Sequence, residues 1–258
     1  MNFVICSGKR CIVKRRDAGV AALALLIVWQ ILAKIVSLPI LPAPLQVLGV
    51  LVSELQYGLS THFVYSLWRV FAGMALSVLA AVPVGLAIGG SKILDRFFSP
   101  LIYLLYPIPK VVFVPVVILF LGIGDTAKIT IIFMILFFQI VVLVRDQAAG
   151  LPPQLIQSLR SVGAGRRALF RFVYLPASLP AILTALRQSI GTAVAVLYIT
   201  ELSATKYGLG YYIYYNGSTL LDYPAMYAGV IAMSLLGLGM YLTVDWLERR
   251  WCRWQFVS

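Results

Sequence analysis

The sequence predicts an all-α membrane protein with six transmembrane helices, and three observations lead to this prediction. The 258 residues are 61% hydrophobic and only 12% charged, with a mean hydropathy of +0.94, whereas soluble domains carry roughly a quarter charged residues. Several apolar runs reach the about 20 residues that a helix needs to cross a bilayer. The charges gather in short clusters at the ends of those runs, which is typical of charges that set membrane topology.

Six apolar runs are expected to span the membrane, and the third is the least regular. They cover residues 17–36, 64–90, 99–121, 127–144, 177–202 and 224–246. Pro107, Pro109 and Pro115 interrupt the third run, and each proline frees a backbone carbonyl that neighbouring protein must satisfy. We therefore expect this helix inside a bundle, lining a path. The first run continues from Ala18 past Trp29 without a convincing cleavage site, so we expect an uncleaved span rather than a secretory signal.

The basic residues predict the orientation of the chain. One side of the membrane receives most of the 21 Lys and Arg, whereas the other receives only Lys34, Lys128 and Lys206. Because basic segments stay in the cytoplasm, both termini are predicted to be cytoplasmic. The expected organisation is a cytoplasmic basic segment at 1–16, a six-helix transmembrane domain at 17–248 with a long cytoplasmic loop at 146–176, and a cytoplasmic tail at 249–258.

Charge and cysteine patterns argue against several other kinds of site. The net charge is +12, but the basic residues form no patch on a polar module, so no nucleic-acid binding is expected. Cys6, Cys11 and Cys252 are accompanied by a single histidine, His62. We therefore expect free thiols and no metal. The sequence contains no glycine-rich phosphate loop ending in Lys-Ser/Thr and no evident pair of catalytic groups, so we expect neither catalysis nor a cofactor bound by the chain itself.

A stripe of small residues marks one face of the second span. Its members, each four positions apart, are Gly73, Ser77, Ala81, Gly85 and Gly89. This spacing keeps them on one helix face, where small side chains let a second backbone approach closely. We expect the stripe to be a helix-packing surface.

The loop between the fourth and fifth spans contains a second pattern. It is long for a connection within a small domain, and it reads QAAGLPPQLIQSLRSVGAGRRALFRFVYLPASLP. It resembles the "EAA" loop of binding-protein-dependent ABC transporter permeases, which is Glu-Ala-Ala, three residues, Gly, nine residues, then Ile-x-Leu-Pro. Aligned on the glycine, the pattern falls on Gln157–Leu159, Gly163, Val173, Leu175 and Pro176. The glycine, the spacing and the Leu-Pro match, whereas Glu-Ala-Ala itself is not kept.

More of the chain is similar to one branch of that superfamily, the permeases for nitrate, sulfonates, taurine and bicarbonate. The similar segments are Leu41–Pro44, His62–Gly73, Ser99–Lys128, Leu175–Ala193 and Ile199–Ile213. The resemblance implies a type I (MetI-like) importer permease, a multi-pass protein of the bacterial inner (plasma) membrane. Its expected partners are two ABC ATPase subunits that bind ATP and Mg, a second copy or a sister permease, an extracytoplasmic solute-binding protein and membrane lipid.

The resemblance also implies a function. The chain would form the pathway for a small anionic solute such as nitrate, a sulfonate, taurine or bicarbonate. It would couple transport to ATP hydrolysis on the partner subunits through the cytoplasmic loop. A thiamine-precursor-like or other small organic solute is the alternative within the superfamily. From another class, an ion-gradient-driven secondary transporter would show broken helices in both halves, and here only the third run is clearly broken.

The loop residues are expected to contact the ATPase. A helix at Pro153–Val162 would lie in a groove of that partner, followed by a break at Gly163 and Gly165 and a second helix at Arg166–Tyr174. The residues assigned to this coupling loop are Leu155, Ile156, Gln157, Leu159, Arg160, Gly163, Arg166, Arg167, Leu175 and Pro176. Its arginines could pair with acidic groups of the ATPase or with anionic lipid, and the sequence leaves both readings open.

Polar residues within the spans are candidates for the translocation path, because they are costly in a bilayer. The candidates are Arg69, Lys110, Gln188 and Glu201. Arg69 could instead extend to the membrane surface, and Gln188 could form a hydrogen bond between helices. Arg187 could pair with a carboxylate or with backbone. The tyrosine-rich segment at 203–224 is expected to be mostly an interfacial aromatic belt, with docking of a solute-binding protein as the alternative.

Overall fold

The computed structural model describes residues 3–4, 12–13, 15–161, 163, 165–202 and 205–253. Within these residues the regular secondary structure is helical, apart from a short antiparallel β-ladder in which Phe3 pairs with Val13. The predicted class, an all-α membrane protein, is confirmed.

The chain forms two compact units. Unit 1 comprises residues 1–60 and 213–230, and unit 2 comprises residues 61–212 and 231–258. Two long helices, α3 (Leu59–Gly89) and α11 (Tyr223–Trp251), contribute to both units. All the candidate site residues named above lie in unit 2.

Unit 1 contains β1 (Phe3–Val4), β2 (Ile12–Val13), α1 (Arg15–Val36), α2 (Pro44–Tyr57) and the π-helix η3 (Tyr215–Leu220). The sequence prediction did not include α2, because its 14 residues are too few to cross a bilayer. The sequence nevertheless favours a helix start there: Pro44 occupies the first turn, and the Gln46 side chain accepts a hydrogen bond from the Ala43 N–H (3.3 Å).

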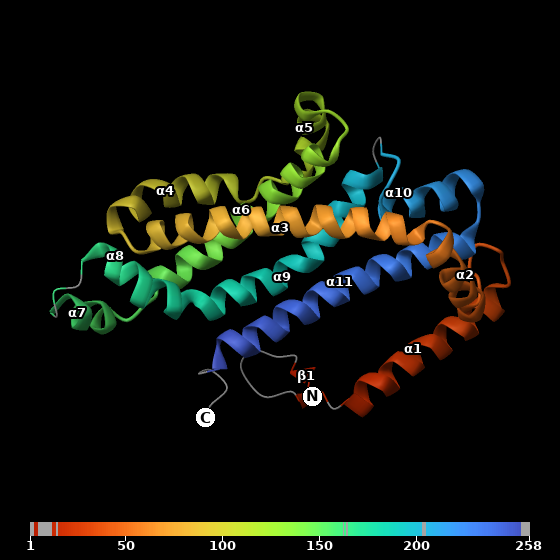
Figure 1. The fold of residues 1–258 in the computed structure, drawn as a ribbon, viewed down its shortest axis with the longest axis horizontal. Helices are drawn as coiled ribbons and strands as arrows, with labels where there is room; N and C mark the ends of the chain where they lie inside the picture. The colour runs from red at the N-terminus through yellow and green to blue at the C-terminus, as the bar shows by residue number, and fades with distance from the viewer. Residues whose placement is uncertain are drawn as a thin grey trace. The chain divides into compact units, whose positions relative to one another are not determined.

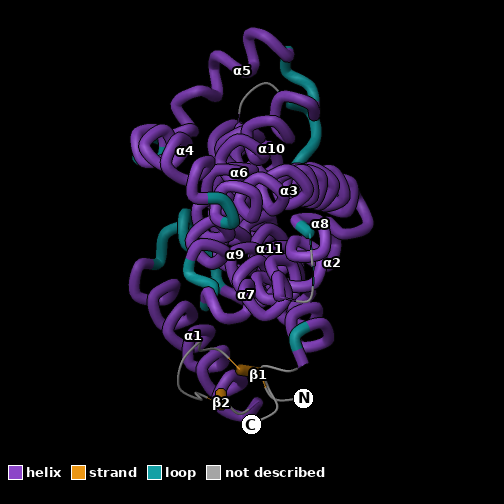
Figure 2. The backbone as a smooth tube through the Cα atoms, turned by 90° about the vertical axis from the view of Figure 1, so that its left-hand side faces the viewer, coloured by secondary structure: helices purple, strands orange, loops and turns teal. Residues whose placement is uncertain are grey.

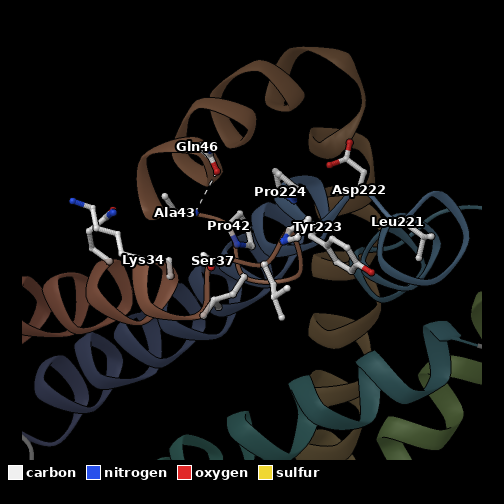
Figure 3. A pocket seen from close by; sticks show the side chains of 14 residues that line it. Lys34, Ser37, Pro42, Ala43, Gln46, Leu221, Asp222, Tyr223 and Pro224 are labelled. Atoms are coloured by element: carbon white, nitrogen blue, oxygen red, sulfur yellow. Dashed lines mark hydrogen bonds between the residues drawn. The ribbon is translucent and has the colours of Figure 1, made fainter.

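A cavity of about 480 Å³ in unit 1 lies where α1 ends and α2 begins (Figure 3). Lys34 and Asp222 line it from opposite sides in this view, with the proline-rich turn after Ser37 between them. The Asp222 carboxylate accepts a hydrogen bond from the Ala225 N–H (3.1 Å) and so caps the start of α11. The cavity is on the side of the membrane that the charge pattern predicts to be outside.

Unit 2 is built around three long helices that run alongside one another, α3, α6 (Asp125–Ala149) and α9 (Leu175–Leu202) (Figures 1 and 2). Shorter elements connect these helices to one another and to α11. These are α4 (Lys92–Leu105), the 3-10 helix η1 (Lys110–Phe113), α5 (Val114–Leu121), α7 (Pro153–Ser161), α8 (Arg166–Leu169), the π-helix η2 (Phe170–Tyr174) and the beginning of α10 (Leu209–Tyr214).

Five described helices are long and apolar enough to cross a bilayer, and a bent pair makes a sixth crossing if its two halves act as one. Five of the six predicted spans correspond to single helices, whose ends lie within five residues of the predicted ends. The third predicted span, 99–121, is instead the bent pair: α4 and the η1–α5 segment meet at 76°.

Prolines explain this bend. Pro109 has no N–H to donate to the carbonyl of Leu105, so the helix cannot continue regularly through this point. The Lys110 ammonium replaces the missing donors, because Nζ donates to the carbonyl oxygens of Leu105 (2.8 Å), Tyr106 (2.9 Å) and Ile108 (3.1 Å). A cation at a helix C-terminus also interacts favourably with the helix dipole.

The stripe of small residues on α3 lies against α6. A Cβ added at Gly73 would lie 2.6 Å from Ile132 Cγ2, and one at Gly85 would lie 2.9 Å from Val144 Cβ. Between them, Ser77 Oγ donates to the carbonyl of Phe133 on α6 (3.2 Å). The two backbones therefore approach too closely for larger side chains at these glycines.

The contacts along these helices define two ends of unit 2. At the outer end, α3 begins, α6 begins and α9 ends. At the inner end, α3 ends next to the last turn of α6, since a Cβ at Gly89 would collide with the Arg145 carbonyl. The loop elements α7 and α8 lie at this inner end (Figure 1), which is the end predicted to face the cytoplasm.

Candidate functional sites

The inner loop begins with α7, which presents an apolar face to its surroundings. Leu155 is 48% exposed, and Ile156 and Leu159 are half-buried. Positions i and i+4 are neighbours on a helix surface, and position i+1 falls within the same apolar stripe about 100° wide. Gln157 and Arg160 are exposed beside them. A short helix with this much accessible apolar surface is suited to a protein partner.

A glycine turn follows α7. Gly163 has φ of +84°, and its N–H donates to the carbonyl of Arg160 (2.9 Å). Only glycine adopts this backbone conformation without strain. A Cβ here would meet open space, so the requirement for glycine is one of backbone conformation. Val162, the last residue of the helix that the sequence predicts here, lies outside the described residues.

The second part of the loop is anchored to the bundle. Leu169 and Val173 are buried, and the Tyr174 hydroxyl lies 3.4 Å from the carbonyl of Gly90 at the end of α3. Arg167 is exposed and Arg171 lies over the ring of Phe172 (5.9 Å). The Arg166 side chain lies outside the described residues.

No break separates this second part from the fifth span, which differs from the sequence expectation. The backbone passes from α8 through η2 into α9, and the Leu175 N–H donates five residues back, to Phe170. Pro176 has no N–H for the carbonyl of Phe172, and the wider π-turn accommodates this missing donor. Leu175 is half-buried and Pro176 is exposed, so the Leu-Pro pair lies within a continuous helix.

The outer end of unit 2 contains a buried ionic cluster centred on Arg69. This side chain is only 3% exposed. Its Nε and Nη2 lie 2.9 Å and 2.7 Å from Asp125 Oδ1, and Nη1 donates to Glu201 Oε1 (2.7 Å) and to the carbonyl of Tyr207 (2.7 Å). Arg69 therefore joins α3, α6, α9 and the outer loop.

Glu201 is completely buried and accepts several hydrogen bonds. The Ser66 hydroxyl lies 2.8 Å from both carboxylate oxygens, and the Gly210 N–H donates to Oε2 (2.8 Å). The Ser66 oxygen in turn accepts from the Leu209 N–H (2.8 Å). Such charge-assisted bonds compensate for the cost of burying the carboxylate.

Two glycines allow the outer loop to lie directly on this ion pair. Gly208 has φ of +136°, and a Cβ there would lie 2.5 Å from Glu201 Oε1 and 2.7 Å from Arg69 Nη1. At Gly210 a Cβ would lie 2.7 Å from Glu201 Cβ. His62 Nδ1 lies 3.0 Å from the backbone nitrogen and oxygen of Gly208 and adds a further contact with α3.

Of the four candidate path residues, the structure brings Arg69 and Glu201 together and leaves the other two apart from them. Lys110 binds the carbonyls at the end of α4 and lies 4.8 Å from the ring centroid of Phe138. Gln188 is exposed on α9. Arg187 pairs with Glu248 (2.9 Å) and Asp245 (3.4 Å) on α11. Of its two expected partners, a carboxylate or backbone, the structure shows the carboxylate.

Sequence reasoning missed the partners that hold these charges. Asp125, Ser66 and Gly208 were not singled out, and neither was Arg145, which pairs with Asp95 on α4 (2.6 Å). One signal was available: the chain has only nine Asp and Glu, and a carboxylate close to a span is expected to find a cation. Which cation it finds depends on the fold, because Arg69 and Glu201 are 132 positions apart.

No group of three or more His, Cys, Asp or Glu suited to a metal ion occurs among the described residues. Cys6 and Cys11 lie outside them. The thiol of Cys252 is buried just after α11, and burial raises its pKa.

Comparison with known proteins gives a consistent result. Residues 73–253 match the family model described as "Binding-protein-dependent transport system inner membrane component". The taurine transport system permease protein TauC of Escherichia coli is 30% identical over 243 residues, covering 92% of this chain and 88% of TauC. The formylaminopyrimidine transport permease protein ThiX of Halalkalibacterium halodurans is 27% identical, covering 90% of this chain and 93% of ThiX.

The fold is also similar to a solved structure. A chain from an inward-facing conformation of the MetNI methionine ABC transporter superposes with a TM-score of 0.65 at 20% identity, covering 77% of this chain and 98% of that one. This similarity supports the predicted importer-permease architecture.

Proposed function

We propose that the chain forms the pathway for a small anionic solute of the sulfonate type. The chain belongs to the family of binding-protein-dependent transport system inner membrane components, and the proposal starts from that membership. The coarser role follows from the family: the chain is the permease subunit of an ABC importer in the bacterial inner membrane, and it is not itself an enzyme. An ATPase and a solute-binding protein are the partners of such a permease.

The observation that carries the solute class is the similarity to TauC, which extends over 92% of this chain. The buried arginines of the spans do not add to it, because Arg69, Arg145 and Arg187 are each paired with carboxylates. Selection among solutes is therefore expected to rest mainly on the solute-binding protein. A formylaminopyrimidine-type solute is the second candidate, since ThiX is similar over 90% of the chain.

Uptake by the reconstituted complex tests this proposal. The permease is placed in proteoliposomes with its ATPase and solute-binding protein, and entry of radiolabelled taurine and of a formylaminopyrimidine is measured with and without ATP. ATP-dependent accumulation of taurine alone is the expected result. Accumulation of the formylaminopyrimidine alone would replace the sulfonate assignment with the second candidate.

The coupling of transport to ATP hydrolysis is assigned to the inner loop. ATP and Mg would bind on two partner ATPase subunits, and α7 would insert its apolar face into a groove of one of them. Two features support this assignment: the exposure of Leu155 and the position of α7 at the end of unit 2 where α6 ends and α9 begins. Arg160, Arg167 and Arg171 are exposed nearby and would pair with the ATPase or with anionic lipid.

Replacing Gly163 tests the coupling role. Gly163→Val forces a β-branched residue into a left-handed conformation and should reorient α7. We expect ATP-driven uptake to fall by about tenfold, corresponding to about 1.4 kcal/mol of lost coupling, while the permease is still inserted in the membrane. Gly165→Val, where φ is not positive, is the matched control. Unchanged uptake by Gly163→Val would contradict the assignment.

The permease is also proposed to act as a pair, either with a second copy or with a sister chain. Large apolar side chains are exposed on α4 and α5, including Ile93 (82%), Leu119 (82%) and Phe120 (80%), and these surfaces would contact lipid or another subunit. Of the four candidate path residues, Gln188 is the one that has an exposed side chain on a spanning helix. We propose it as a path-lining residue, with Lys110 close to the bend of the third span.

A further inference from the structure

The outer loop at 205–210 is held on the helix bundle by hydrogen bonds to buried side chains. These bonds have no part in the proposed coupling through the cytoplasmic loop. Four hydrogen bonds join this loop to side chains of α3 and α9. Tyr207 accepts from Arg69, Gly208 contacts His62, Leu209 donates to Ser66 and Gly210 donates to Glu201, while Glu201 itself accepts from Arg69.

The same cluster connects the three long helices. Ser66 and Arg69 belong to α3, Asp125 begins α6 and Glu201 ends α9. Ser66, Arg69 and Glu201 are almost completely buried. Breaking a buried ionic contact is costly, so a displacement of the loop is expected to displace the attached helix ends rather than detach from them.

The outward side of the loop is accessible. Lys206 is exposed and Tyr207 is 47% exposed, and the Tyr207 ring stacks on Tyr65 of α3 (5.1 Å between centroids). Aromatic and basic side chains on a fixed backbone make a surface suited to a protein partner. In a binding-protein-dependent importer the partner on this side of the membrane is the solute-binding protein.

We propose that Ser66, Arg69 and Glu201 form an outer node that transmits docking of the solute-binding protein on the 205–210 loop to α3, α6 and α9. The node is the outer counterpart of the cytoplasmic loop. This inference rests on the proposed function, because it requires an importer with a docking partner. Ser66 is the positioning residue that distinguishes it, since its hydroxyl donates to Glu201 and accepts from the loop backbone at the same time.

The experiment uses the complete complex in proteoliposomes. ATP hydrolysis is measured without and with solute-loaded binding protein, and the ratio of the two rates is the readout. Ser66→Ala removes both hydrogen bonds, and Ser66→Thr keeps the hydroxyl. The control is Ser77→Ala: Ser77 is equally buried on α3, but its hydroxyl bonds to the carbonyls of Gly73 and Phe133, so it lies outside the node.

We expect Ser66→Ala to lower the stimulation ratio by about fivefold, which is the lower end of typical coupling energies. Ser66→Thr should restore it, and Ser77→Ala should keep the wild-type ratio even if both alanine variants lose similar thermal stability. The inference would be overturned if Ser66→Ala kept the wild-type stimulation ratio, or if Ser66→Ala and Ser77→Ala lowered that ratio equally. Either result would leave the proposed function standing. If the wild-type complex shows neither stimulation nor uptake, the proposed function fails, and the inference fails with it.

Discussion

The outer and inner ends of unit 2 each have a loop close to charged side chains. The two ends differ in whether those side chains are buried and bonded to the loop or exposed. At the outer end Arg69 and Glu201 are buried, bonded to each other and covered by the backbone at 207–210. At the inner end Arg160, Arg167 and Arg171 are exposed. Among the described residues of α7, the side-chain hydrogen bonds are local, from Ser158 to Gln154 and from Ser161 to Gln157.

This difference indicates what each loop is suited to do. A loop bonded to buried charges keeps one conformation and moves only with its helices. A loop whose apolar and basic side chains remain accessible gains most of its contacts from a partner. The outer loop is therefore suited to transmit a force to the bundle, and α7 is suited to receive one from the ATPase.

The largest expected effect comes from breaking the outer ion pair. Glu201→Leu leaves Arg69 without its buried partner and removes the acceptor for Ser66 and Gly210, so the free energy of unfolding should fall by about 4 kcal/mol. The measurement is unfolding in mixed detergent micelles. Glu201→Gln keeps an acceptor oxygen and should lose less. A cost below about 1 kcal/mol for Glu201→Leu would show that the outer end is not held by this pair.

A pair of glycine substitutions sharpens the comparison. Gly208→Ala combines an unfavourable backbone conformation with a collision against Glu201 and Arg69, and it should lower the free energy of unfolding by about 3 kcal/mol. Gly163→Ala meets open space and should cost only about 1 kcal/mol for its left-handed conformation. Equal costs would contradict the difference in packing between the two loops. The same unfolding assay measures both variants.

The sequence could predict the elements of this fold but not the contacts between them. Hydropathy and charge placed five spans close to the observed helices, because burial in lipid depends on local composition. The prolines of the third span indicated an irregularity, but not a 76° bend capped by Lys110. Arg69 and Glu201 were each identified as unusual, yet their pairing depends on how α3 and α9 pack. Residues such as Ser66 and Gly208 became significant only through that pairing.

The smallest effect on stability is expected at the inner loop. Leu155→Asp places a charge on an exposed side chain, so the free energy of unfolding should change by no more than about 0.5 kcal/mol. ATP-driven uptake should nevertheless fall severalfold, because the same side chain is proposed to enter the ATPase groove. Gln154→Asp on the neighbouring, exposed face serves as the control. A large stability loss in Leu155→Asp would mean that α7 packs within the permease instead of against a partner.

Hydrogen exchange of the permease, alone and bound to its ATPase, tests the central contrast most directly. In the isolated permease, the amides of Leu209 and Gly210 should exchange slowly, because both donate to buried side chains, whereas the amides of α7 should exchange faster. Binding of the ATPase should slow exchange in α7 and leave the outer loop unchanged. Fast exchange at Leu209 and Gly210, or an α7 that the ATPase does not protect, would contradict this account.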